Sequence, residues 1–170
     1  MIDVATLTPG CHAVIIAAGH WYRETRTDAG VEVSFSDEAA IEAIIDGYTV
    51  ESVRARMKSQ VSAFSKKLTD KAIATVSRGE ASSWPLKLAE LNAYTASGDP
   101  ADAPMLSKEA TWRQISLDAL VAKVRANAAQ FSALEAWIRG IDGYHRDRIA
   151  ELTEVLDIER YDFSAGWPEL

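Results

Sequence analysis

The sequence has few of the residues on which metalloproteins and disulfide-bonded proteins depend. Its 170 residues include one cysteine, Cys11, and three histidines, His12, His20 and His145. A single cysteine cannot form an internal disulfide, so a reducing compartment is expected. None of the histidines belongs to an HExxH motif or has a cysteine at a zinc-binding spacing. We therefore expect no metal and no cofactor.

Long apolar runs and catalytic signatures are also missing. No stretch is apolar over the length that crosses a bilayer. The opening "MIDVATLTPG" has neither the basic nor the apolar region of a secretory signal, so no such signal is expected. The sequence contains no G-x-S-x-G, Walker or G-x-G-x-x-G motif. Together these absences predict a protein that is not an enzyme and does not enter a membrane.

What the sequence does contain is an ordinary globular composition with an uneven charge. Hydrophobic residues make up 48% and charged residues 25% of the chain, and the net charge is -7. Residues 1–49 carry a net charge of -6 and residues 147–170 carry -5, whereas residues 50–78 carry +5. The basic segment raises the possibility of nucleic-acid binding. Because the whole chain is acidic, we favour a solvated basic face or contact with the acidic segments, and nucleic acid is an unlikely partner.

The N-terminal part has the pattern of β-structure. The apolar run "HAVIIAA" (12–18) lies between turn-forming residues and predicts a strand. The segments "HWYRETR" and "VEVSFS" flank "TDAG", which predicts a hairpin with Asp28 and Gly30 at its turn. Ser36 is then the expected N-cap of a short helix that ends at Gly47.

After Gly47 the apolar residues recur every three or four positions, as in amphipathic helices. The third helix is expected to begin at Ser82 or Ser83, which places Pro85 in its first turn, where a missing N–H costs nothing. Trp84 is expected to be a core residue of this helix. The remaining helices are expected at about Val50–Arg78, which Gly79 would close, at 106–115, and in near-continuous form from Ser116 to about 152, with Gly98 ending the third.

These patterns predict an α+β protein. A small N-terminal β-hairpin module with one short helix occupies residues 1–49, and a mainly α-helical bundle with two long helices occupies residues 50–152. Residues 153–170 form an acidic tail with aromatic anchors. Since the helical segment has its own apolar stripes, we expect residues 50–152 to fold without residues 1–49.

Two residue groups have a chemical interpretation beside a structural one. Cys11 and His12 could be a thiol and its base, but neighbours on a strand point to opposite faces. Glu38, Glu42 and Asp46 share a helix face and could bind a divalent cation, although such carboxylates usually form a solvated face. We prefer the structural interpretation of both groups.

Aromatic residues supply the candidates for partner binding, because Trp and Tyr dominate interface hot spots. The tryptophans on predicted helices, Trp112 and Trp137 as well as Trp84, are expected to pack in or over the core. The candidates for partner contact are Trp21 and Tyr22 in the hairpin, and Tyr161, Phe163 and Trp167 in the tail. The alternative for the tail is that it folds back on the basic helix, at Arg54, Lys58 and Lys66.

The order of these elements resembles a family of small bacteriophage tail proteins, described as tail fibre assembly or tail fibre-associated proteins. The resemblance covers about residues 50–152, with "RQIS" (113–116) standing where the pattern has an Arg-Gly step. It is carried by Trp84, Glu90, Ala93, Pro104, Leu106, Leu120, Ala128, Phe131 and Gly143.

The resemblance implies a function by protein–protein contact. It implies a chaperone-like assembly factor whose partner is a phage tail or tail fibre protein, in an oligomeric assembly. The location would be the host cytoplasm during assembly, with retention in the virion tail as a further possibility. The alternatives are a permanent virion component, such as a fibre adaptor or a decoration of tail or head, and, more remotely, an enzyme or a nucleic-acid-binding protein.

Overall fold

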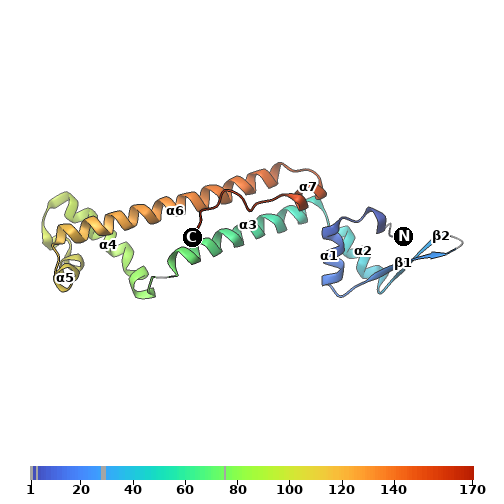
Figure 1. Ribbon diagram of the computed structural model, residues 1–170, viewed down its shortest axis with the longest axis horizontal. Coiled ribbons are helices and arrows are strands. Elements are labelled where there is room, and N and C mark those ends of the chain that lie inside the picture. The colour runs from blue at the N-terminus through green and yellow to red at the C-terminus, as the bar shows by residue number, and fades with distance from the viewer. Residues whose placement is uncertain (1, 3, 28–29, 75) are drawn as a thin grey trace. The chain divides into compact units, whose positions relative to one another are not determined.

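The computed structural model describes residues 2, 4–27, 30–74 and 76–170, so the expected turn residue Asp28 lies outside the described residues. It confirms an α+β fold, with a two-stranded antiparallel hairpin followed by a helical bundle with long helices (Figure 1). The elements are a 3-10 helix η1 (Val4–Thr6), α1 (Pro9–Ala17), β1 (Tyr22–Thr27), β2 (Gly30–Phe35), α2 (Glu38–Gly47), α3 (Val50–Ile73), α4 (Arg78–Ser97), η2 (Pro100–Asp102), α5 (Pro104–Trp112), α6 (Leu117–Glu151) and α7 (Val155–Arg160).

The chain forms two compact units that do not follow the predicted domain boundary at residue 49. The first unit comprises Met1–Ser62 and Gly143–Ala165, and the second comprises Ala63–Asp142 and Gly166–Leu170. Helices α3 and α6 each contribute residues to both units. The N-terminal module therefore shares its unit with the start of α3 and the end of α6.

Helix α1 replaces the strand predicted for residues 12–18, and that prediction is wrong. Thr8 is the N-cap, since its side chain accepts a hydrogen bond from the Cys11 amide, and Pro9 lies in the first turn. The Pro-Gly pair thus begins a helix instead of a turn. Cys11 and Ile15, one helical turn apart, are buried with Ile41 of α2 in the core of the first unit.

The predicted hairpin is confirmed. Strand β1 pairs with β2 in a two-stranded antiparallel sheet whose register places Tyr22 opposite Phe35 and Thr27 opposite Gly30. Phe35 packs against the Cys11–Ile15–Ile41 cluster, which anchors the base of the hairpin. Away from this base the hairpin side chains become exposed.

The N-cap of α2 differs from the prediction by one residue. The side chain of Asp37 accepts a hydrogen bond from the Ala40 amide and caps the helix, whereas the Ser36 hydroxyl accepts one from the Trp21 amide. A carboxylate at this position also interacts favourably with the helix dipole. Ser36 consequently closes the hairpin instead of starting the helix.

A carboxylate from the C-terminal part of the chain lies at the N-terminus of α1. Glu159 of α7 accepts hydrogen bonds from the Thr8 hydroxyl at 2.7 Å, the Gly10 amide at 3.3 Å and the Tyr48 hydroxyl at 2.5 Å. Burial opposes ionisation of Glu159, but these hydrogen bonds outweigh it and lower the pKa of the carboxyl. A Cβ atom at position 10 would overlap the Glu159 carboxylate and the Tyr48 hydroxyl, so both groups would have to shift to admit any other residue there.

The break between α3 and α4 lies earlier than predicted. Helix α3 ends at Ile73, and Ser77 caps α4 by accepting a hydrogen bond from the Glu80 amide. Gly79 therefore lies inside α4 and does not close α3. Pro85 is likewise in the helix interior, seven residues after its start, instead of in the first turn. Gly98, with a φ of 72°, ends α4 as predicted.

The second unit has its own core around the start of α6. Leu91 of α4, Leu106 and Ala110 of α5, and Leu120 and Val121 of α6 are buried together. Ser116 precedes α6 and accepts a hydrogen bond from the Ala119 amide, as expected of its cap. The prediction of a near-continuous helix is confirmed, because α6 runs unbroken through its two glycines.

Candidate functional site: an apolar groove in the second unit

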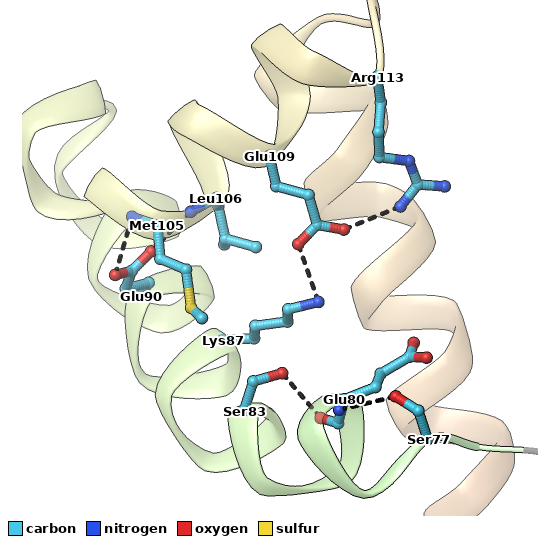
Figure 2. Close-up of polar contacts among 9 residues, drawn as sticks. All are labelled: Ser77, Glu80, Ser83, Lys87, Glu90, Met105, Leu106, Glu109 and Arg113. Atoms are coloured by element: carbon cyan, nitrogen blue, oxygen red, sulfur yellow. Dashed lines mark hydrogen bonds and ion pairs between the residues drawn. The ribbon is translucent and has the colours of Figure 1, made fainter.

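The joint between α4 and α5 is fixed by a buried carboxylate. Glu90 is only 7% exposed, and its two oxygens accept hydrogen bonds from the amides of Met105 at 3.1 Å and Leu106 at 2.9 Å (Figure 2). These amides belong to the first turn of α5, which has no side-chain cap of its own. Glu90 therefore supplies the missing acceptor and the negative charge that a helix N-terminus favours.

With α5 held in this way, an apolar groove of about 490 Å³ opens in the second unit. We call this feature the groove. Such a volume lies within the range of about 300–1,000 Å³ that is common for ligand sites. The apolar side chains that line it are Ala72, Val76, Trp84, Leu88, Leu120, Val124, Ala128, Phe131 and Leu134.

Two aromatic rings belong to the groove lining. The rings of Trp84 and Phe131 lie 5.2 Å apart between centroids, in an edge-to-face arrangement. Both side chains are half-buried, and Leu88, one helical turn beyond Trp84, is 38% exposed. The expectation that Trp84 is a core residue is therefore wrong, since one side of it faces the groove.

A charged cluster borders the apolar lining. The Glu109 carboxylate forms ion pairs with Lys87 at 2.8 Å and Arg113 at 2.9 Å (Figure 2). The hydrogen bond from Lys87, reinforced by that from Arg113, outweighs burial and lowers the pKa of Glu109. Two cations thus share one ionised carboxylate, so this cluster has a net charge of +1. It offers electrostatic complementarity to one negative charge on a bound molecule.

The two hairpin residues that were predicted to bind a partner differ in exposure and in the contacts they make. Trp21 is 49% exposed, and its amide is held by Ser36. Tyr22 is half-buried, and its hydroxyl contacts the imidazole of His12. Partner contact stays a prediction for both residues, although the Tyr22 hydroxyl already has a partner within the first unit.

The aromatic residues of the tail pack on the rest of the chain, and their binding to a partner stays a prediction. Within the first unit, the Tyr161 hydroxyl is 2.8 Å from Nδ1 of His145, and the Phe163 ring lies 6.5 Å from the same imidazole. His145 is buried because these aromatic groups and the Ala165 carbonyl surround it. A histidine at a helical position, about twenty residues away, was the anchor that sequence reasoning did not find.

The end of the tail packs in the same manner within the second unit. The ring of Trp167 lies 5.2 Å from that of Phe64, and the Gly166 carbonyl accepts a hydrogen bond from Trp137 at 2.8 Å. Lys71 also contacts the terminal Leu170 carbonyl. The tail therefore folds back on the basic helix α3, as in the predicted alternative, but in this unit it does so through Phe64 and Lys71 instead of Arg54, Lys58 and Lys66.

Two further tryptophans are more exposed than the sequence indicated. Trp112, at the end of α5, is 87% exposed, and Trp137 is 53% exposed, although both were expected to pack in or over the core. Both were assigned to the core only because they lie on predicted helices, and that position does not show how far each side chain is from the true core.

The structure also locates the two residue groups for which a chemical interpretation was considered. Cys11 and His12 lie on a helix, so the argument from opposite strand faces does not apply; Cys11 is buried, and burial raises the pKa of its thiol. Glu38, Glu42 and Asp46 are exposed on α2. Among the described residues, no group of three or more His, Cys, Asp or Glu side chains is arranged to hold a metal ion.

The chain was compared with protein families, curated proteins and solved structures. None of the three comparisons gave a match. Within the described part of the chain, no helix has the length and apolar character needed to cross a membrane.

Proposed function

We propose that this chain is a non-enzymatic bacteriophage tail protein that acts by protein–protein contact, as a chaperone-like tail fibre assembly factor or a fibre-associated protein. The groove is the observation that carries the proposal. Four of the residues on which the family resemblance depends, Trp84, Leu120, Ala128 and Phe131, line it. Three more belong to the elements that support it: Glu90 caps α5, Pro104 starts α5, and Leu106 of α5 is buried in the core of the second unit.

The groove fits a segment of a partner protein that carries a large apolar side chain next to a carboxylate. The apolar part would pack on Trp84 and Phe131, which already form an aromatic pair. The carboxylate would complement the excess positive charge of the Lys87–Glu109–Arg113 cluster. Docking of an amphipathic segment into an apolar groove is a common mode of peptide recognition.

Such a contact has a physical purpose in fibre assembly. Tail fibres are elongated, β-rich oligomers whose unpaired edges and apolar seams can aggregate before assembly is complete. A protein that covers one such apolar segment keeps it out of incorrect contacts until the correct subunit replaces it. The proposal places this chain in the host cytoplasm during assembly, with a phage tail or tail fibre protein as its partner.

The test is co-expression with the fibre protein of the same phage, followed by affinity measurement. Leu88→Lys puts a charge into the groove at a side chain that is already 38% exposed, so folding should survive. We expect this variant to weaken binding at least tenfold, which corresponds to about 1.4 kcal/mol. Trp112→Ala is the matched control, since it removes an exposed aromatic side chain that does not line the groove.

Equal binding by the wild type and Leu88→Lys would contradict the proposal, as would failure of the wild type to bind any tail or fibre protein. Counting copies of the chain in purified virions distinguishes the two forms of the proposal. An assembly factor should be absent or sparse, whereas a permanent structural component should be present in a fixed ratio to other tail proteins.

A further inference from the structure

The hairpin has two different edges, and their chemistry follows from its register. The Trp21 carbonyl accepts a hydrogen bond from the Ser36 amide at 2.9 Å. In an antiparallel pair, residues that exchange hydrogen bonds alternate with residues that do not. With Tyr22 opposite Phe35, the inward-bonded pairs are Arg23–Ser34, Thr25–Glu32 and Thr27–Gly30.

The backbone groups of the alternate residues therefore point away from the hairpin. On β2 these outward-facing residues are Val31, Val33 and Phe35, and on β1 they are Tyr22, Glu24 and Arg26. Charged side chains protect an edge against pairing, whereas a β-branched, uncharged edge invites it. The charged β1 edge is thus protected against strand pairing, whereas the β2 edge is available to pair with another strand.

The hairpin is supported by packing only near its base. A two-stranded sheet is marginally stable alone, and either further strands with an apolar face or packing against a helix is needed for independent stability. Phe35 is packed on the core of the first unit, but Val31, four residues earlier on the same face, is 58% exposed. One face of β2 thus continues the apolar surface of the core into solvent.

We propose that β2 pairs antiparallel with β2 of a second copy of this chain, which forms a four-stranded sheet centred on Val33. In this register Val33 lies opposite its own counterpart, and Val31 lies opposite Phe35 of the other copy. The outward backbone groups of these residues would then be paired across a two-fold axis, which is the commonest symmetry of soluble oligomers.

Charge selects this register over its neighbours. In the Val33-centred register Glu32 faces Ser34 of the other copy, so no like charges meet. A shift that centres the pairing on Glu32 would place two glutamates directly opposite each other, which is destabilising. A shift that centres the pairing on Ser34 would place Val31 opposite Asp37 of the other copy. Asp37 lies beyond the end of β2 and already caps α2. This inference concerns the hairpin alone and does not depend on the proposed function of the groove.

The first test uses proline to remove one outward N–H at a time from the full-length chain. Val33→Pro deletes a donor on the β2 edge, and Arg26→Pro deletes the equivalent donor on the β1 edge; neither N–H bonds within the hairpin. Light scattering coupled to size-exclusion chromatography should give a dimer for the wild type and for Arg26→Pro, and a monomer for Val33→Pro. A monomeric wild type at every concentration, or a dimeric Val33→Pro, would overturn the proposal.

The second test does not depend on how well a proline variant folds. Directly opposed hydrogen-bonded residues have Cα atoms about 5.5 Å apart, which is within the roughly 4.4–6.8 Å that a disulfide spans. In a Cys11→Ala background, Val33→Cys should therefore give a covalent dimer on mild oxidation, and Glu24→Cys on the other edge should not. Equal cross-linking of the two variants, or none with Val33→Cys, would refute strand pairing between copies.

Discussion

Helices α1 and α5 form an instructive pair, one in each unit. Each has nine residues and begins with a proline, and each has a distant glutamate at its N-terminus. They differ in where the first cap comes from. Helix α1 has Thr8 as a local cap with Glu159 added, whereas α5 follows Ala103, which makes no side-chain cap, and depends on Glu90 for its first amides.

This difference shows that the acceptors for the first amides of a helix can come from the adjacent sequence or from a residue that is distant in the chain. At α1 the local signal, Thr-Pro, is sufficient, and Glu159 joins the helix to α7. At α5 the carboxylate is both the cap and the joint, because nothing else in the described structure accepts those two amide hydrogen bonds. The two helices should therefore respond differently when single groups are removed.

The largest effect is expected for Glu90→Ala. It leaves the amides of Met105 and Leu106 without their acceptor in a largely buried site, at about 1–3 kcal/mol for a buried unsatisfied donor. We expect the free energy of unfolding to fall by about 3 kcal/mol in urea denaturation. Glu80→Ala, an exposed glutamate on the same helix, is the control and should change it little. A loss below about 1 kcal/mol for Glu90→Ala would mean that α5 has another source of stability.

Gly10→Ala should have the next largest effect, because the added methyl group overlaps the Glu159 carboxylate and the Tyr48 hydroxyl. We expect a loss of about 2 kcal/mol, within the range for overpacking. Gly47→Ala is matched to it, since a methyl group there meets nothing within 4 Å. If both variants unfold at the wild-type denaturant concentration, the carboxylate can move aside freely and does not hold α1.

Thr8→Ala makes α1 resemble α5 by removing its local cap. Loss of an N-cap hydroxyl typically costs about 1 kcal/mol, and this hydroxyl also donates to Glu159. Thermal unfolding should shift downward modestly, while Thr153→Ala at an exposed position should leave it unchanged. A shift as large as that of Glu90→Ala would show that Glu159 cannot sustain the helix start by itself.

The smallest effect is a pH dependence at Glu159. Its pKa is lowered by folding, so its stabilising contribution is complete above the pKa of an unfolded glutamate, about 4.3, and is lost as the pH falls through the lower folded value. The stability difference between wild type and Glu159→Gln should therefore shrink between about pH 6 and pH 3. A difference that stays constant over this interval would mean that the charge of Glu159 contributes nothing.

Much of the fold could be predicted because its signals are local. The hairpin has alternation and a turn sequence, and α6 has a long apolar period after Ser116. The failures occurred where signals conflict. Residues 12–18 form an apolar run too short to separate strand from helix by period, and Thr8 decided the outcome. The serines before Trp84 resembled a cap, but Ser77 capped α4 first.

The groove could not be predicted, because its residues come from four separate parts of the chain. Trp84 and Phe131 were each visible as helical apolar residues, yet their contact across 47 positions has no local signal. The packing of the tail could not be predicted for a related reason. Its aromatics lacked a helical period, which suggested contact with a partner, but their contacts with His145 and Phe64 do not require any period.

Pro85 has a consequence for the timescale on which the groove changes. Proline has no amide hydrogen, so the Ala81 carbonyl, four residues earlier, loses its helical bond, and the first turns of α4 are joined to the rest of the helix by fewer hydrogen bonds. Hydrogen–deuterium exchange should therefore be faster in residues 79–84 than in residues 87–97. Trp84 lies at the end of that fast-exchanging segment, so brief local unfolding would remove one wall of the groove without unfolding the second unit.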